Sequence, residues 1–244
     1  MNSEQEFRTL NGAEAHPGEK GAGSAAVPAV KTLRSGVFAY PRIKNVFDRT
    51  AAFFALVILS PAIAVITLTI RLDSPGNPVF SQERVGKDGR RFNFYKFRSM
   101  YLDHDDSEYY RLIKNYVQGE DVSQPSPEGA FGTRDRRVTR IGRFLRKTNL
   151  DELPQLLNIL KGDMSFVGPR PMIPFMVEMY SDRHKKCLEA RPGLAGLWQA
   201  SGRKDLTFEE MIDLDLDYIK SQSFSLDVKI IFLTARAVLR GEGS

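Results

Sequence analysis

The sequence feature that most constrains the fold is a run of twenty residues without a charge, from Ala51 to Ile70. As a helix, such a run is about 30 Å long, which matches the hydrocarbon core of a bilayer. Ser60-Pro61 lies at its centre. Proline removes an amide donor and its ring collides with the carbonyl of Val57, so a helix bends here, while the Ser60 hydroxyl can help to satisfy the freed carbonyls. The run therefore predicts a membrane helix with a break in its middle.

Basic residues flank both ends of this run and leave its path through the bilayer open. Arg42, Lys44 and Arg49 precede it, and Arg71 follows it. Because basic flanks favour the cytoplasmic side, the pattern favours two cytoplasmic ends. Each half of the helix rises about 15 Å, enough to reach the midplane of the bilayer and return. A helix-break-helix over residues 41–72 is thus one prediction, and an ordinary spanning helix is the other.

Charge and composition narrow the partners of the chain without choosing among them. The 244 residues carry a net charge of +5, which favours phosphorylated ligands, anionic lipids or nucleic acid. One cysteine, Cys187, excludes an intrachain disulfide, and the three histidines lie far apart without zinc-ligand spacing. A hard cation held by carboxylates is therefore favoured over zinc.

Local patterns predict the remaining elements. Residues 1–40 are rich in Gly, Ala, Glu, Ser and Pro, which indicates a disordered arm. Residues 78–98 predict an antiparallel hairpin, since Asp88-Gly89 is a turn signal between two strand-like runs. Apolar periodicity predicts helices near 109–117, 137–146, 152–161, 174–183, 208–220 and 226–239. The expected fold class is α+β and rich in helix, with a small antiparallel hairpin.

The last of these helices carries both apolar and basic side chains. Lys229, Arg236 and Arg240 lie on one side of it, among isoleucine, leucine, valine and phenylalanine. This composition fits an amphipathic helix in the membrane interface. Packing against the core of the protein fits the same pattern, so both interpretations stay open.

The adjacent carboxylates Asp151 and Glu152 are the first candidates for chemistry. Pro154 lacks an amide hydrogen and is tolerated in the first turn of a helix, so Asp151 lies near a helix start. One interpretation is a capping carboxylate. The other is functional: a carboxylate near the positive end of a helix dipole stays ionised and can bind a divalent cation or attack an electrophile. Glu152 can orient Asp151 or complete a metal site.

Arginines near this pair are candidates for phosphate binding. Arg146 lies five residues before Asp151. Arg170 stands between Pro169 and Pro171, whose fixed φ angles give a stiff backbone that suits a bidentate grip on phosphate, although a structural turn also fits. Arg203 ends a run in which glycines permit turns, so it too is an arginine presented by a turn.

These motifs together resemble the monotopic phosphoglycosyl transferases, bacterial sugar transferases that begin glycan assembly on a polyprenyl carrier. The resemblance runs from about residue 44 to residue 241 and depends on several motifs in order. They are Ser60-Pro61, QERVGKDGRRFNFYKFRSM (82–100), RVTRIGRFLRKTNLDELPQLLNILKGDMSFVGPRP (137–171), RPGLAGLWQASGR (191–203) and SFSLDVKIIF (223–232). One departure is visible, because the family often has Lys-Arg where this chain has Lys44-Asn45.

The resemblance implies a role for each candidate residue. It implies a re-entrant helix that breaks at Ser60-Pro61 and lies before a catalytic domain over residues 73–244, with interfacial amphipathic helices. It implies Asp151 as nucleophile and Mg²⁺ ligand, and Glu152 as its partner. Further roles are implied for two sets: phosphate or substrate contact for Arg146, Arg170 and Arg203, and lipid headgroup contact for Lys44 and Arg49.

The activity implied is transfer of a sugar-1-phosphate from a UDP-sugar to polyprenyl phosphate with release of UMP. The implied location is the cytoplasmic face of the bacterial inner membrane, and the glycan is an exopolysaccharide or another surface polymer. Galactose or glucose is favoured as the sugar, and the oligomeric state stays open. The alternative from charge alone is a bitopic anchor with a basic domain that binds nucleic acid or anionic lipid without catalysis, although no nucleic-acid motif is recognised.

Overall fold

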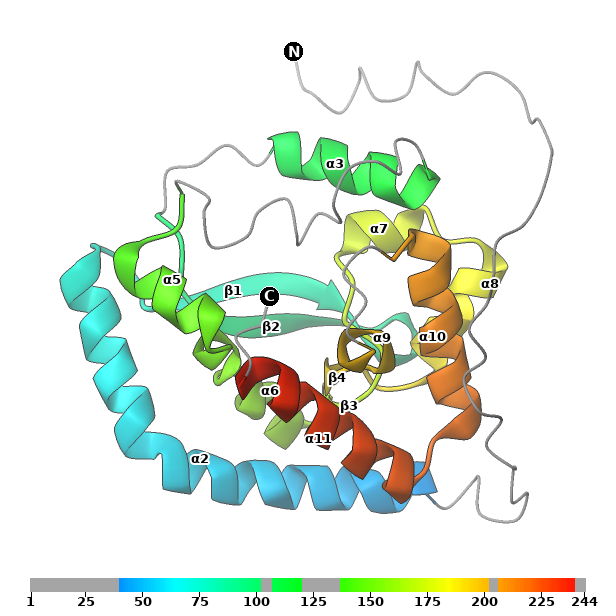
Figure 1. Ribbon diagram of the computed structural model, residues 1–244, viewed down its shortest axis with the longest axis horizontal. Coiled ribbons are helices and arrows are strands. Elements are labelled where there is room, and N and C mark those ends of the chain that lie inside the picture. Colours follow the sequence, from blue (N-terminus) through cyan, green and yellow to red (C-terminus); the bar gives the residue numbers. More distant parts are fainter. Residues whose placement is uncertain (1–39, 102–106, 120–136, 202–205, 240–244) are drawn as a thin grey trace. The chain divides into compact units, whose positions relative to one another are not determined.

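The computed structural model describes residues 40–101, 107–119, 137–201 and 206–239. The N-terminal arm predicted for residues 1–40 lies outside the described residues except for its last position, and Arg203 also lies outside them. The helices and strands that follow are shown in Figure 1.

The described chain is rich in helix, with two small two-stranded sheets, which confirms the helix-rich class with an antiparallel hairpin. In chain order the elements are α2 (Tyr40–Asp73), β1 (Val79–Val85), β2 (Arg91–Phe97), α3 (Ser107–Gln118), α5 (Arg140–Lys147), α6 (Gln155–Lys161), β3 (Ser165–Val167), α7 (Pro174–Glu178), α8 (Asp182–Lys185), β4 (Gly193–Ala195), α9 (Leu197–Ala200), α10 (Phe208–Ser221) and α11 (Phe224–Leu239). Short 3-10 turns cover 87–89, 150–152 and 186–189.

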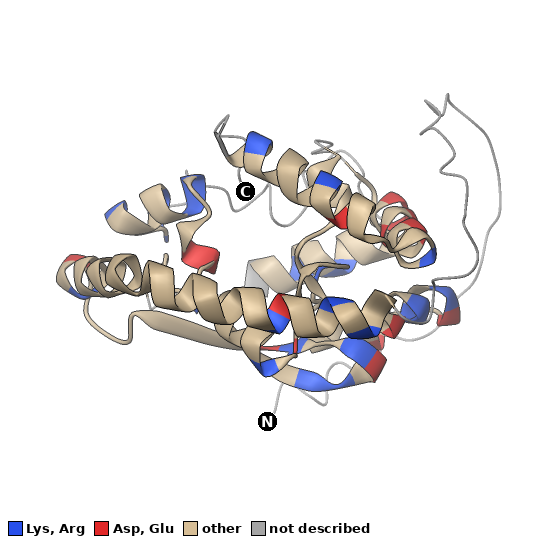
Figure 2. Cartoon of the chain, turned by 90° about the horizontal axis from the view of Figure 1, so that it is seen from below, with Lys and Arg blue, Asp and Glu red and all other residues tan. Residues whose placement is uncertain are grey.

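Helix α2 contains the whole uncharged run and is long and apolar enough to cross a membrane. It stays helical through Pro61 and bends part-way along its length (Figure 1). The Ser60 hydroxyl donates to the carbonyl of Val57, 2.8 Å away, so the hydroxyl satisfies a carbonyl next to the proline. The predicted break is therefore a bend within one continuous helix. Most of α2 is tan in Figure 2, since its charges lie near its two ends.

The predicted hairpin is confirmed. Strands β1 and β2 pair antiparallel, with Val79 opposite Phe97 and Val85 opposite Arg91. The turn between them needs positive φ angles, 57° at Asp88 and 75° at Gly89. Asp and Gly are among the residues that adopt this region most readily, which is why this dipeptide predicts the turn.

Two helix boundaries differ from the predicted ones because side chains cap the helices. The helix predicted from residue 137 begins at Arg140, since the hydroxyl of Thr139 accepts from the amide of Gly142. The helix predicted over 174–183 is two helices, α7 and α8, because Ser181 caps a new start by accepting from the amide of His184. The parallel pair β3–β4 was not predicted, as three-residue strands carry little pattern.

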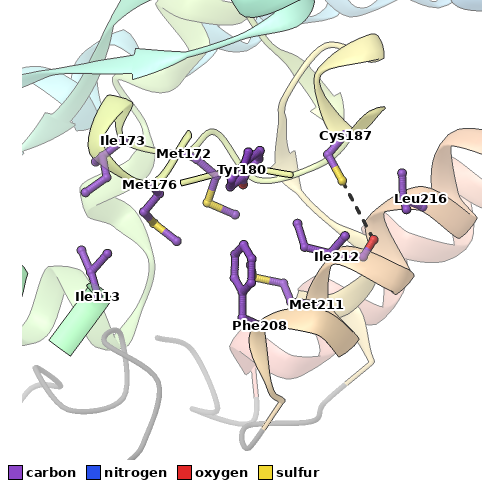
Figure 3. Close-up of a cluster of buried hydrophobic side chains, with 10 residues drawn as sticks. All are labelled: Ile113, Met172, Ile173, Met176, Tyr180, Cys187, Phe208, Met211, Ile212 and Leu216. Carbon is purple, nitrogen blue, oxygen red and sulfur yellow. Dashed lines mark hydrogen bonds between the residues drawn. The ribbon is translucent and has the colours of Figure 1, made fainter. Parts of the chain in front are cut away.

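Separate apolar clusters hold these elements together. One joins α2, β2 and α6 through Ala52, Phe94, Leu156, Ile159 and Met164. Figure 3 shows another, in which side chains of α7 and α10 point toward one another together with Ile113 of α3 and Cys187. The first cluster packs α6 against β2 and the middle of α2.

Helix α11 is packed on one side and exposed on the other. Ile230 is buried among β3, β4 and α10, together with Leu226. The opposite side exposes a row of large apolar side chains four, three and one residues apart, namely Phe224, Val228, Ile231 and Phe232. The predictions of core packing and of an amphipathic helix at the membrane interface are therefore compatible, since one side of α11 packs against the core and the other side exposes apolar residues.

The buried guanidinium of Arg98 ties the end of α2 to the hairpin. Its Nη1 donates to the carbonyl of Pro75 (2.6 Å), and its Nη2 donates to the carbonyl and the hydroxyl of Ser74 (2.7 and 3.0 Å). Hydrogen bonds from a charged donor in a buried place are among the stronger ones in proteins. This contact therefore fixes where the membrane helix meets the rest of the chain.

We expect Arg98→Met to lower the free energy of unfolding by about 2–4 kcal/mol, because two backbone carbonyls lose their donors inside the protein. The melting temperature in detergent micelles should fall by about 5–12 °C. Arg91→Met is the matched control, since Arg91 begins β2, the strand that Arg98 follows, and forms an exposed ion pair with Glu83 that contributes at most about 1 kcal/mol. Equal losses in the two variants would contradict the anchoring role.

Candidate active site

The two candidate carboxylates lie in the 3-10 turn Leu150–Glu152, between α5 and α6. Asn149 precedes the turn with a φ of 53°, a left-handed conformation that asparagine tolerates. Asp151 is buried, with 5% of its surface exposed. Helix α6 begins at Gln155, with Pro154 at the N-cap position and no side-chain cap. Within the described residues, Asp151 Oδ1 has no hydrogen-bond partner. Asp151 is thus not a capping residue, and its free oxygen points to another use.

Lys96 of β2 is the cation closest to both carboxylates in the described ion pairs. Its Nζ lies 2.8 Å from Glu152 Oε1 and 3.7 Å from Asp151 Oδ2. The same Nζ lies 5.7 Å from the centre of the Phe94 ring, which limits its freedom. Sequence reasoning missed Lys96. The pattern that could have indicated it is the alternation of side chains along a strand, which places Lys96 on the same face of β2 as Phe92 and Phe94.

The surrounding charges act differently on the two carboxyl groups. Burial is the largest influence on Asp151 and raises its pKa, and the negative charge of Glu152 raises it further. The positive charges of Lys96 and Arg146 lower it, but the pKa stays above the ordinary value. Burial also raises the pKa of Glu152, but Lys96, followed by Arg170, outweighs burial and leaves the pKa below its ordinary value. The pair therefore holds one firmly ionised carboxylate beside a more basic one.

Three of the predicted site residues come together with Asp151. Glu152 shares its turn, Arg146 comes from the last turn of α5, and Arg170 follows β3. The charges of Arg146 and Arg170 are close enough to influence the pKa of Asp151 and of Glu152, respectively. The site thus contains two acidic groups among three cations, which suits the binding of an anionic ligand.

The segment that carries Arg170 is fixed by close backbone contacts. Gly168 and Gly193 cross so closely that a Cβ on Gly193 would lie 2.1 Å from the amide nitrogen of Gly168, so a side chain is excluded there. Arg84 of β1 donates through Nη1 to the carbonyl of Pro171 (3.2 Å). Sequence reasoning missed Arg84 as well. These contacts hold the Pro169–Pro171 segment against the hairpin.

The residues predicted to face lipid headgroups lie in two different environments. Lys44 is largely buried, paired with Asp227 of α11 and 3.5 Å from Asp48. Arg49 donates through Nε to the carbonyl of Leu160 at the end of α6 (2.9 Å). The headgroup role of both residues stays a prediction, and their observed contacts join α2 to the rest of the protein.

A buried polar network surrounds Asp227. Its two carboxylate oxygens accept from the hydroxyl of Tyr40 (2.6 Å) and the hydroxyl of Tyr218 (2.8 Å), in addition to Lys44. Tyr218 also contacts the carbonyl of Val167 in β3 (3.0 Å). Because buried polar groups need specific partners, this network gives α2 a defined position on α10, α11 and β3.

These features define a class of protein: a membrane-associated transferase, with one long exposed apolar helix and a carboxylate pair held among cations. Comparison with known proteins agrees. The model of the bacterial sugar transferase family matches residues 39–241. The chain belongs to the bacterial sugar transferase family, and the resemblance to phosphoglycosyl transferases is confirmed.

Several relatives share more than a third of the aligned residues. The galactosyl transferase CpsE of Streptococcus agalactiae is 43% identical over 202 residues, covering 82% of this chain and 43% of the relative. The undecaprenyl-phosphate galactose phosphotransferase of Salmonella typhimurium is 38% identical over 203 residues, covering 83% and 41%. The exopolysaccharide production protein ExoY of Rhizobium meliloti is 36% identical over 203 residues, covering 82% and 87%. The chain thus spans about two fifths of the first two relatives and most of the third.

We expect Lys96→Met to destabilise the protein at neutral pH by about 2–4 kcal/mol, because two buried carboxylates lose a counter-charge. The depressed pKa of Glu152 contributes stability above the unfolded pKa, and this stability is lost as pH falls through the folded pKa. In the wild type this loss takes place below about pH 4.5, the ordinary value for glutamate. Without the lysine charge, burial raises the pKa of both carboxyls, so the folded variant takes up protons as the pH falls from 7. The stability deficit of the variant should therefore shrink between pH 7 and pH 4.5. Melting temperatures across this range measure the effect.

Lys161→Met is the control for this substitution, since Lys161 Nζ contacts the hydroxyl of Tyr95 and no carboxylate among the described contacts. Its deficit should be small and independent of pH. A Lys96→Met deficit that stays constant over the same range would show that Lys96 does not stabilise the ionised carboxylates.

Proposed function

We propose that the protein transfers a sugar-1-phosphate from a UDP-sugar to polyprenyl phosphate, through a covalent intermediate on Asp151. The observation that carries the proposal is the buried Asp151, whose Oδ1 has no hydrogen-bond partner among the described residues, beside Lys96, Arg146 and Glu152. A carboxylate without donors on one oxygen keeps that lone pair for attack on phosphorus.

The reaction takes place in two displacements. In the first, a carboxylate oxygen of Asp151 forms a bond to the phosphorus that carries the sugar, the bond from this phosphorus to the bridging oxygen breaks, and UMP leaves with the electron pair. In the second, an oxygen of polyprenyl phosphate attacks the same phosphorus, and the Asp151 carboxylate is released. The product is a polyprenyl-diphosphate sugar. A covalent intermediate divides one difficult transfer into two easier ones.

The cations around the pair bind and orient the phosphates. Arg146 and Arg170 supply guanidinium groups for the donor, since planar forks match phosphate oxygens. The same role for Arg203, which lies outside the described residues, rests on the family resemblance alone. Lys96 holds Glu152 at 2.8 Å, so Glu152 stays ionised and limits how far the lysine can move toward Asp151. The raised pKa of Asp151 makes its carboxylate a stronger base, and therefore a better nucleophile, than an exposed aspartate.

The site fits a magnesium ion only together with the donor phosphates. Within the described residues there is no group of three Asp, Glu, His or Cys side chains, whereas Mg²⁺ in phosphoryl transfer is commonly held by one or two carboxylates plus substrate phosphates. The second carboxylate oxygen of Asp151, the one that does not attack phosphorus, is a suitable hard ligand. When bound there, the ion would neutralise charge on the phosphates.

The membrane has a direct part in this proposal. The polyprenyl acceptor keeps its tail in lipid, so its phosphate is available only at the headgroup layer. We propose that α2 enters and leaves the cytoplasmic leaflet of the inner membrane as a re-entrant helix, which its bend supports. The exposed apolar row of α11, which includes Phe232 at 66% exposure, would lie in the interface.

The class of donor is a UDP-hexose. The names of two relatives refer to transfer of galactose, and the name of a third refers to exopolysaccharide production. These names support a galactose donor and a role in starting a surface glycan. Family membership favours this enzyme over the basic nucleic-acid-binding anchor that the charge alone allowed.

We expect Asp151→Asn to abolish UMP release while the protein stays folded and bound to membranes, because an amide cannot form the acyl phosphate. UMP release from UDP-galactose and UDP-glucose, with membrane-embedded polyprenyl phosphate, measures this loss. Mass spectrometry of wild type incubated with donor alone should show a sugar-phosphate adduct on the peptide that contains Asp151. The control is Asp163→Asn, since Asp163 is partly exposed and lies in the turn after α6. This variant should behave like wild type. Near-normal turnover in Asp151→Asn would remove the nucleophile from the proposal.

Arg170→Lys should lower kcat/KM about 10- to 100-fold, since a point charge replaces a planar fork. The steady-state rate with saturating acceptor measures this effect. Unchanged kinetics would make the Pro169–Pro171 segment a turn without a role in binding.

The path of α2 is tested by labelling near its two ends. Ile43 and Leu72 are both exposed, so each can be replaced by cysteine in a Cys187→Ser background. In sealed vesicles of defined orientation, a maleimide that cannot cross membranes should reach both positions from the cytoplasmic side. Labelling from opposite sides would make α2 a spanning helix.

A further inference from the structure

The side chain of Asn158 in α6 is fully buried and pairs with the free edge of β2. Its Nδ2 donates to the carbonyl of Asn93 (2.6 Å), and its Oδ1 accepts from the amide of Tyr95 (3.2 Å). A residue on a neighbouring parallel strand makes the same two contacts, one to the residue before and one to the residue after its partner. Asn158 thus imitates one residue of a third strand, opposite Phe94.

The backbone of the same residue closes the end of α6. The carbonyl of Asn158 accepts from the amides of Gly162, Asp163 and Met164 at 3.0–3.3 Å. Gly162 has a φ of 91°, the left-handed conformation that ends many helices. One residue therefore fixes both the end of the helix and the position of β2 along it.

The position of β2 along α6 decides what Lys96 can reach. Lys96 follows Tyr95 on β2, and the two carboxylates lie just before α6. A slip of two residues would keep the same face of β2 toward the carboxylates but would carry Lys96 about 7 Å along the strand, away from Asp151 and Glu152. Burial of Phe94 opposes a slip of one residue, which would turn its ring out of the apolar cluster. It discriminates less against a slip of two residues, because Phe92 lies on the same face and packs against the same cluster.

We propose that Asn158 is a positioning residue, whose amide sets the register of β2 on α6 and thereby holds Lys96 against the carboxylate pair. The inference deepens the proposed function and rests on it for its kinetic test. Asn158 touches no substrate in this account, and it acts only through Lys96.

The test compares two fully buried neighbours on α6. Asn158→Leu keeps the volume and removes both hydrogen bonds, while Ile159→Ala removes apolar packing from the same cluster, where Ile159 is 0% exposed. We expect Asn158→Leu to lower kcat about 10- to 100-fold with a KM for the donor within about threefold of wild type. Ile159→Ala should lower the melting temperature at least as much, with kcat within about threefold of wild type.

The split between kcat and KM separates positioning from loss of stability. A loss of kcat in Asn158→Leu no larger than that in Ile159→Ala would overturn the inference.

A double-variant cycle gives a test that needs no turnover. If Asn158 acts through Lys96, the pH-dependent melting deficit of Lys96→Met should be largely absent when Lys96→Met is made in Asn158→Leu. A full deficit in that background would overturn the inference. If Asn158→Leu does not fold, Asn158→Ser, which can keep one of the two hydrogen bonds, should show half-way behaviour in the same cycle.

The two proposals fail in different ways. A wild-type protein that releases no UMP from any UDP-sugar would overturn the proposed function, while the melting cycle would still decide the role of Asn158. An active wild type with independent effects of Asn158→Leu and Lys96→Met would overturn the positioning role alone.

Discussion

Two neighbouring carboxylates are withdrawn from water beside Lys96, and much of the molecule serves this arrangement. Burying a carboxylate is costly unless a counter-charge and hydrogen bonds are held in place around it. The apolar cluster of α2, β2 and α6 supplies the dry surroundings, and β2 supplies the lysine. The unequal pKa shifts of Asp151 and Glu152 follow from burial and from Lys96, with Arg146 acting on the first and Arg170 on the second.

The membrane helix is joined to this site through several independent contacts. Arg98 donates hydrogen bonds that join the end of α2 to the hairpin, and Arg49 donates one to the end of α6. At the start of α2, Asp227 accepts a hydrogen bond from Tyr40 and pairs with Lys44. These contacts are directional, in contrast to the apolar surface that α2 and α11 expose. The position of α2 relative to the site is therefore set by polar contacts inside the protein, and its apolar surface is left exposed.

Much of the fold could be predicted because its signals are local. The uncharged run predicted α2, the Asp88-Gly89 turn predicted the hairpin, and long apolar periods predicted α3, α10 and α11. Helix boundaries were less certain, since single hydroxyl caps at Thr139 and Ser181 moved them. Strands β3 and β4 were missed because three residues are too short to show a period, and their pairing joins segments far apart in the chain.

The sequence by itself determined which chemical groups are present and which segments are apolar: two adjacent carboxylates, an arginine between two prolines and a helix long and apolar enough to cross a membrane. Only the tertiary structure decided that Lys96 stands over the carboxylates, that Arg84 holds the segment after Arg170, and that Asn158 pairs with β2. The physical reason is that local patterns report on neighbours along the chain, whereas an ion pair or a buried amide depends on how two distant segments are registered against each other.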